Sequence, residues 1–222
     1  FRSMTKRAVK TNVHLGSPYS SRGKDQQGDP VRFVGSVGCR AMHGTEHGFV
    51  TAAHCLPKMG LSVCIGETDT NLGKVTSVKL NASSDAAFVA VDYDKYYPTN
   101  TTYRTKTALY DKILKNSSLV GYEVSTEGQK TANVVKAKVT EINKKVHVQK
   151  WTPAGQADFY ANNMVYATFT SSQTQEGDSG GIVYVNGYVA GIHSARLGNT
   201  TQIFSSAELV LKDLGLTNIW EK

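Results

Sequence analysis

The pentapeptide Gly-Asp-Ser-Gly-Gly at residues 177–181 places a hydroxyl among glycines that free the backbone around it. Acyl transfer by a serine needs a base for the hydroxyl proton, a group that orients the base, and donors for the oxyanion. Ser179 would be the nucleophile. Because Gly177 has no Cβ, its N–H can turn inward beside the N–H of Ser179 and form an oxyanion hole with it. The motif therefore predicts a reactive serine, with a Gly-rich turn before a strand as the plainer interpretation.

A histidine and a carboxylate that precede this motif complete the chemistry. His54, in the segment TAAHC, follows an apolar run, so a strand would deliver it to the edge of a lobe. Asp85 begins the apolar segment DAAFVAVD and Asp92 ends it. We prefer Asp85 as the orienting carboxylate because a residue at the start of a strand can face a cleft while the strand enters the core. Asp92 is interpreted as a turn residue.

The elements that must position these residues are mostly strands. Hydrophobic residues make up 40% of the 222 residues, with 20 Gly and 11 Tyr, which is typical of a globular, β-rich chain. Short apolar runs alternate with Gly, Asn and charged turns from residue 31 onward. We expect strands within 33–39, 48–55, 61–66, 73–80, 85–92, 119–126, 133–142, 145–151, 163–170, 181–185 and 188–194.

Two local signals are sharper than the rest. Asn186-Gly187 between the last two apolar runs predicts a tight β-hairpin. Near the end, Ser206 as a cap, apolar residues at helical spacing and Gly215 as a stop predict a helix over 207–214. The polar stretch 94–118 is interpreted as a crossing between two lobes.

Charge and composition limit the partners. The net charge is +7, but the lysines are scattered, and Lys136 and Lys138 alternate with apolar neighbours like a solvated strand face. We therefore expect no nucleic-acid partner. No apolar stretch approaches the ~20 residues of a membrane helix, so no membrane partner is expected. His43 and His47 are close in sequence, but the glycines between and after them argue against a metal-binding helix, and we predict neither metal nor cofactor.

His54, Asp85 and Ser179, in that chain order, resemble the chymotrypsin-like (trypsin-fold) serine proteases over about residues 33–216. The segments YEVSTEGQKT and AELVLKDLGL are similar to the compact bacterial streptogrisin-type enzymes. The resemblance implies an all-β fold of two six-stranded antiparallel β-barrels and a short C-terminal helix. On this basis we divide the chain into an irregular segment 1–30, barrels at 31–105 and 106–205, and a helix and tail at 206–222.

The resemblance also implies roles for single residues. Ser179 would be the nucleophile, His54 the base and then the acid, and Asp85 the orienting group, with the amides of Gly177 and Ser179 as the oxyanion hole. Ser194 matches a serine that usually hydrogen-bonds the triad aspartate. Asp178 lacks a visible partner, because the arginine of streptogrisin-type enzymes corresponds to Thr126 here, and Lys130 is a weak substitute.

The cysteines and the glycosylation patterns indicate in which cellular compartment the protein is made. The resemblance implies a disulfide between Cys39 and Cys55 and leaves Cys64 unpaired. Asn-X-Ser/Thr patterns favour a eukaryotic secretory route and a secreted glycoprotein. They begin at Asn81, Asn100, Asn116 and Asn199.

The expected specificity pocket contains a histidine. Counting back from Ser179, its base falls near Gln173 and Thr174. Trypsin-like enzymes carry an aspartate at the first of these positions, so a preference for Arg or Lys is not expected. His193 matches the pocket histidine of glutamyl endopeptidases, and with Thr174 it can donate hydrogen bonds to an acidic side chain. Arg196 lies just beyond and favours acidic groups. A neutral pocket with a broad small or apolar preference is the alternative.

These observations predict a secreted, monomeric serine endopeptidase that acts on proteins or peptides and prefers Glu, Asp or Gln at P1, the residue before the cut bond. One alternative is a protease-fold binding or inhibitor protein. Another is a viral polyprotein-processing protease, since such enzymes share a similar pocket histidine.

Overall fold

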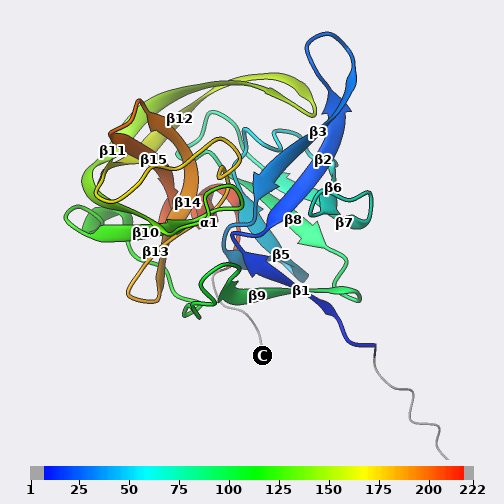
Figure 1. Cartoon of the computed structure of the whole chain (residues 1–222), viewed down its shortest axis with the longest axis horizontal. Coiled ribbons are helices and arrows are strands. Elements are labelled where there is room, and N and C mark those ends of the chain that lie inside the picture. The colour runs from blue at the N-terminus through cyan, green and yellow to red at the C-terminus, as the bar shows by residue number, and fades with distance from the viewer. Residues whose placement is uncertain (1–7, 218–222) are drawn as a thin grey trace, which may run out of the picture.

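The computed structural model describes residues 8–217, and its strands form two assemblies that lie side by side (Figure 1). Residues 1–7 of the predicted N-terminal segment and residues 218–222 of the predicted tail lie outside the described range. Within that range strands dominate and a short α-helix follows the last strand, as predicted.

The N-terminal assembly is a seven-stranded antiparallel sheet in the order β3-β2-β6-β7-β8-β5-β4. Its strands are β2 (Pro18–Lys24), β3 (Pro30–Ser36), β4 (Arg40–His43), β5 (Glu46–Thr51), β6 (Ser62–Ile65), β7 (Asn71–Val78) and β8 (Ala87–Val91). Phe49, Leu56, Leu72 and Val89 are fully buried in its core. Burial of such side chains is the main force that holds the sheet together.

The C-terminal assembly is a closed six-stranded barrel in the order β10-β11-β12-β15-β14-β13. Its strands are β10 (Glu123–Glu127), β11 (Val135–Thr152), β12 (Gly155–Phe169), β13 (Ile182–Val185), β14 (Tyr188–Leu197) and β15 (Thr201–Ser206). The predicted hairpin joins β13 to β14, and both Asn186 and Gly187 adopt positive φ there, at 51° and 79°. The predicted two-barrel arrangement is confirmed.

The N-terminal segment is more ordered than predicted. Instead of an irregular stretch over 1–30, residues 11–15 form β1 (Thr11–Leu15) and residues 18–24 form β2. β1 pairs in parallel with β9 (Tyr96–Thr102), which lies inside the stretch interpreted as a crossing. Because β2 comes from the segment predicted to be irregular, the first sheet has seven strands where six were predicted.

The hairpin of β11 and β12 is the longest element of the fold. The two expected strands at 133–142 and 145–151 merge into β11, because Asn143 takes a positive φ of 58° and the register shifts there without breaking the pairing. Figure 1 shows the hairpin arching from the barrel towards the turn between β2 and β3. At its tip the indole N–H of Trp151 donates to the Lys24 carbonyl oxygen at 2.7 Å.

This hairpin also contributes to the other assembly's core. Ala157 and Phe159 of β12 are buried among the core residues of the N-terminal sheet. Farther along β12, the N–H groups of Asn162 and Asn163 donate to the carbonyl oxygens of Ala82 and Ser83, at 2.9 Å each. The hairpin therefore spans the junction between the two assemblies.

The helix α1 (Ala207–Leu214) ends at Gly215, whose φ of 65° is the left-handed conformation that glycine favours, so its predicted end is confirmed. A short 3-10 turn, η1 (Asn116–Ser118), precedes β10 and contacts α1. No helix among residues 8–217 is long and apolar enough to cross a membrane.

The implied disulfide is absent. Cys39, Cys55 and Cys64 are all free thiols. Cys39 is buried in the apolar cluster that α1 shares with β13 and β14, whereas Cys55 packs against the core of the N-terminal sheet. The two thiols belong to different packing clusters, and burial raises the pKa of the Cys39 thiol to about 12.

Candidate active site

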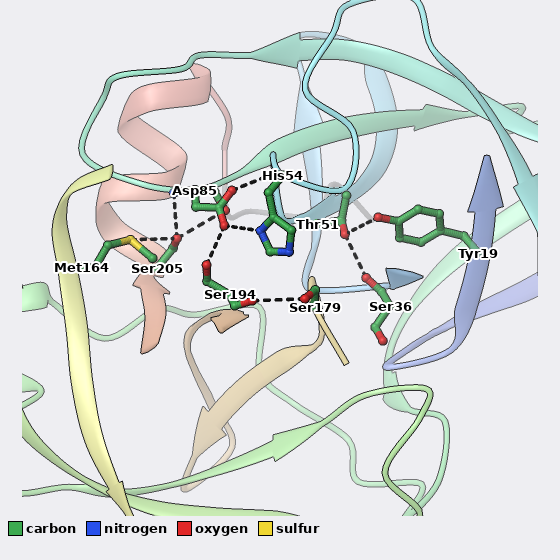
Figure 2. A network of polar contacts seen from close by, with 9 residues as sticks. All are labelled: Tyr19, Ser36, Thr51, His54, Asp85, Met164, Ser179, Ser194 and Ser205. Carbon is green, nitrogen blue, oxygen red and sulfur yellow. Dashed lines mark hydrogen bonds and ion pairs between the residues drawn. The ribbon is translucent and has the colours of Figure 1, made fainter. Parts of the chain in front are cut away.

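His54 and Asp85 form a buried pair in the N-terminal assembly (Figure 2). His54 follows β5, and Asp85 precedes β8, the strand hydrogen-bonded to β5. Asp85 Oδ2 lies 2.6 Å from His54 Nδ1, and Asp85 Oδ1 accepts the backbone N–H of His54 at 2.9 Å. Ser194 Oγ donates to the same Oδ2 at 2.6 Å. The carboxylate is fully buried and held from three sides, which fixes the orientation of the imidazole.

The pair is electrostatically coupled. Burial by itself would lower the pKa of His54, but the Asp85 carboxylate outweighs it and raises that pKa above its usual range. Burial would raise the pKa of Asp85, but the charge of His54 and the hydrogen bonds from His54 and Ser194 keep it low. The geometry therefore supports an ionised Asp85 that stabilises a protonated imidazole.

Asp92, the other carboxylate considered from the sequence, lies at the opposite end of β8. Its Oδ1 accepts the N–H of Asp94 at 3.3 Å, and Lys95 Nζ lies 3.7 Å from its Oδ2. It contributes to a turn and does not contact His54.

Ser179 comes from the C-terminal barrel, in the turn that enters β13. With His54 it lines two cavities, one on each side. Its Oγ donates to the Ser194 carbonyl oxygen at 3.1 Å, so in this state the hydroxyl points to β14 and not to His54. Figure 2 shows Ser179 beside the His54 ring. Catalytic hydrogen bonds are often loose or poorly aligned in free enzymes, so this orientation of the hydroxyl is compatible with a nucleophilic role.

The residues before Ser179 form a turn with two backbone amides that have no partner among the described residues. Gly177 has a φ of 102°, which a residue with a Cβ rarely adopts. Neither the Gly177 nor the Ser179 N–H donates a hydrogen bond to another described residue. The Gly177 carbonyl oxygen instead accepts from Ser36 Oγ at 2.8 Å, which ties the turn to the end of β3. Two free amides beside the nucleophile are what an oxyanion hole requires.

Asp178 is held by polar groups without a cation. Its Oδ1 accepts the backbone N–H groups of Lys130 and Thr131 at 2.9 Å each, and its Oδ2 accepts the Gln175 N–H at 2.8 Å and the Thr131 hydroxyl. The backbone of Lys130, not its side chain, is the partner. Gly128 is needed at this contact, because a Cβ there would lie 2.5 Å from Asp178 Oδ1.

The four residues expected around the pocket do lie together. Thr174, His193, Ser194 and Arg196 line one cavity of about 440 Å³ beside His54 and Ser179. Thr174 and His193 are buried, whereas Arg196 is exposed and its guanidinium donates to Gln173 Oε1 at 2.6 Å. Burial lowers the pKa of His193 to about 4, so its imidazole is neutral near pH 7.

Sequence reasoning missed two groups at this cavity. The opposite wall is the β11 edge of the long hairpin, residues 146–150. Behind His193 lies Gln202 of β15, fully buried, with its Nε2 3.1 Å from His193 Nδ1. A polar amide in the apolar, strand-like run before α1 is the only sequence signal that could have identified Gln202.

A second cavity, of about 430 Å³, lies on the other side of Ser179 and His54. Its walls come from β3, the residues after His54, the 129–130 loop and the hairpin tip at 150–153. Ser179 therefore lies at the junction of two cavities, an arrangement that suits a peptide chain passing through the site on both sides of a cut bond.

Comparison with known proteins agrees with this geometry. The family model described as Trypsin matches residues 16–206. No curated protein matches the chain. Among solved structures, Thermobifida fusca Protease A aligns with a TM-score of 0.68 and 19% identity over 93% of this chain and 98% of its own.

Two further structures are similar to the same extent. A glutamic-acid-specific serine protease aligns with a TM-score of 0.67 and 22% identity over 92% of this chain and 99% of its own. A Nocardiopsis protease aligns with a TM-score of 0.65 and 23% identity over 93% and 98%. At these identities the likeness establishes the fold, that of the chymotrypsin-like proteases.

Proposed function

We propose that this chain, which belongs to the trypsin family and is a serine endopeptidase, cuts peptide bonds with Ser179, His54 and Asp85 and prefers an acidic residue at P1. The observation that carries the catalytic assignment is the buried His54–Asp85 pair, whose histidine lines the same cavities as Ser179. The two free amides at Gly177 and Ser179 complete the set.

In the proposed reaction the Ser179 hydroxyl turns from the Ser194 carbonyl to His54 Nε2 and gives up its proton as Oγ attacks the substrate carbonyl. The tetrahedral oxyanion receives hydrogen bonds from the N–H groups of Gly177 and Ser179. Asp85 stabilises the imidazolium, which then protonates the leaving amine. Water attacks the acyl-enzyme with His54 again as base, and Ser179 regains its proton.

The preference for Glu, with Asp or Gln as further candidates, rests on the donors of the pocket. His193 and Thr174 can each donate a hydrogen bond to a side-chain oxygen, and the Arg196 guanidinium lies at the cavity wall. The carboxylate among the lining residues, Glu176, is exposed and lies 3.3 Å from Lys150 Nζ, so it is already paired with a cation of this chain. The similar glutamic-acid-specific protease uses a histidine triad in substrate binding. Here a single histidine backed by Gln202 would take that role.

Labelling and cleavage test both parts of the proposal. A fluorophosphonate probe should label the wild-type protein at Ser179 and leave Ser179→Ala unlabelled. A peptide library varied only at P1 should then show Glu far ahead of Lys and Phe. Labelling without an acidic preference would remove the specificity and keep the enzyme assignment. Equal labelling of Ser179→Ala would remove the catalytic assignment.

We further propose that the chain is secreted and carries glycans at Asn81 and Asn199, whose side chains are exposed. Asn116 is buried, and its Nδ2 donates to Asn143 Oδ1 at 3.0 Å, so a glycan there would break the contact. Asn100 Nδ2 donates to the Leu109 carbonyl oxygen at 2.8 Å. Peptide mapping of protein from a eukaryotic secretory host should find sugar at Asn81 and Asn199 and none at Asn116. A glycan on Asn116 would contradict this assignment.

A further inference from the structure

Gln202 lies behind the proposed specificity pocket and contacts His193, one of the residues that line it. It belongs to β15, is fully buried, and its side chain contacts Thr126 of β10 across the barrel. Its Nε2 lies 3.1 Å from His193 Nδ1 and donates to Thr126 Oγ1 at 2.8 Å. Thr126 occupies the position where streptogrisin-type enzymes carry the arginine partner of the aspartate before the serine. Here it accepts a hydrogen bond from Gln202 instead.

The orientation of the Gln202 amide follows from the count of unpaired groups. As it stands, both N–H bonds of Nε2 are used, and Oε1 alone has no partner among the described residues. The reversed amide would bury an NH₂ group with two unpaired donors. Since each buried unpaired group is costly, the orientation that leaves a single acceptor unpaired is favoured.

This orientation decides where His193 carries its proton. An imidazole nitrogen that accepts a hydrogen bond is unprotonated, so Nδ1 is bare and the proton resides on Nε2. Protonation of Nδ1 would set an N–H donor against the Gln202 N–H donor. The charges that act on the ring are Asp178 and Asp85, which favour the imidazolium, and His54, which opposes it with the burial. Arg196, on the same strand, adds a further cation near the cavity.

We propose that Gln202, supported by Thr126, is a positioning residue that keeps His193 neutral with its proton on Nε2, so that the pocket presents an uncharged donor to the P1 side chain. The inference rests on the proposed acidic specificity and deepens it. An uncharged donor suits the oxygen of either Glu or Gln, so the discrimination between these two would not come from His193. The Glu-to-Gln preference should therefore stay constant wherever P1 Glu is ionised and His193 is neutral.

The variant Gln202→Glu tests the positioning role of Gln202, because it replaces the amide by a carboxylate and leaves the rest of the side chain unchanged. Its carboxylate would accept a hydrogen bond from a protonated Nδ1 and raise the pKa of His193, which creates a cationic pocket. With paired peptides that differ only in Glu or Gln at P1, the wild-type ratio of kcat/KM should be flat from pH 5.5 to 8. In Gln202→Glu the ratio should rise by about tenfold towards pH 5.5, because hydrogen bonds between two charged groups are the stronger ones.

Gln156→Glu is the matched control, because it makes the same change at an exposed site on β12. It should reproduce the flat wild-type ratio. A flat ratio in Gln202→Glu, equal to that of Gln156→Glu, would overturn the inference even though the enzyme remains active and selective for acidic P1. Loss of the acidic preference in the wild-type protein would instead be a failure of the proposed function.

A measurement without a change at Gln202 keeps the test decisive if Gln202→Glu does not fold. Nitrogen-15 NMR of histidine-labelled Ser179→Ala protein reports which ring nitrogen of His193 holds the proton, with His193→Leu to assign the signal. The inference expects a neutral ring with the proton on Nε2 from pH 5.5 to 8. A proton on Nδ1, or an imidazolium at pH 6, would overturn it.

Discussion

Each half of the molecule buries one histidine at the candidate active site, and the pKa values of these two histidines shift in opposite directions. His54, after a strand of the N-terminal sheet, is 5% exposed, and His193, in a strand of the C-terminal barrel, is 2% exposed. The pKa of His54 is raised and that of His193 is lowered to about 4. Burial lowers the pKa in both, and only the carboxylate beside His54 reverses it. The partner on Nδ1 is a carboxylate, Asp85, at His54 and an amide, Gln202, at His193, and the carboxylate favours the charged ring.

The largest expected effect is at the nucleophile and at the histidine with the carboxylate. Ser179→Ala and His54→Ala should each lower kcat by about 10⁶, and the double variant should be no slower than either one, because the members of a triad act as a unit. Single-turnover assays with a P1-Glu ester would measure this. Additive losses would mean that the two residues do not act together.

Asp85→Asn removes the difference between the histidines by giving His54 an amide partner like that of His193. We expect kcat to fall by about 10⁴, since the amide disfavours the required tautomer and cannot stabilise the imidazolium. Asp92→Asn, at the other end of β8, is the control and should retain wild-type kcat. The opposite ranking of these two variants would show that the carboxylate is misassigned.

His193→Leu should weaken the recognition of acidic P1 residues without affecting the catalytic steps. It removes one donor to a charged P1 oxygen, a loss of about 1.5–3 kcal/mol that corresponds to tenfold to over a hundredfold in kcat/KM. The loss should be confined to acidic P1, with P1-Leu peptides cleaved at nearly the wild-type rate. An equal loss on both peptides would make His193 part of the scaffold of Ser194.

Thr131→Val tests a carboxylate that is stabilised without a cation. It removes the hydroxyl that donates to Asp178 and leaves two backbone N–H donors from the same loop. Because a hydrogen bond to a charged group contributes about 1.5–3 kcal/mol, we expect a lower Tm and a kcat reduced by about tenfold as the oxyanion turn loosens. Thr105→Val, which loses a hydroxyl contact to Glu127, is a control for the Tm. Unchanged kcat and Tm in Thr131→Val would show that this hydroxyl adds nothing.

The pH profile of kcat/KM should show the titration of His54 and not that of His193. His54 must be neutral to accept the Ser179 proton, so kcat/KM should rise with pH through a midpoint above the ordinary value of about 6.5. His193 stays neutral over this range and should add no second inflection. A pH series on a neutral-P1 peptide measures the midpoint, and a midpoint well below 6 would contradict the effect ascribed to Asp85.

Local features were predicted from the sequence more readily than contacts between residues far apart in the chain. The Asn186-Gly187 hairpin and the stop at Gly215 were predicted because one or two residues fix those backbone angles. The position of Asp85 beside His54 was predicted because the strands that carry them could be recognised. The pairing of β1 with β9 was missed, since it depends on a contact between residues more than eighty positions apart.

Two further differences between the sequence-based predictions and the structure also depend on contacts between distant residues. The Cys39–Cys55 bond was inferred from resemblance, and the structure puts the two thiols in separate clusters. Gln202 was missed because its role exists only where three strands of a closed barrel bring its amide, Thr126 and His193 together. No local pattern encodes such a meeting.

The long hairpin has a consequence for the lifetime of the protein. A protease is exposed to its own activity, and partly opened molecules are the ones that are digested. Because Phe159 of β12 completes the core of the other assembly, neither half can open without disrupting the packing of its neighbour. We therefore expect the hairpin to make the two barrels unfold together as one cooperative unit. If so, the resistance of the protein to its own activity would be set by how rarely that whole unit opens.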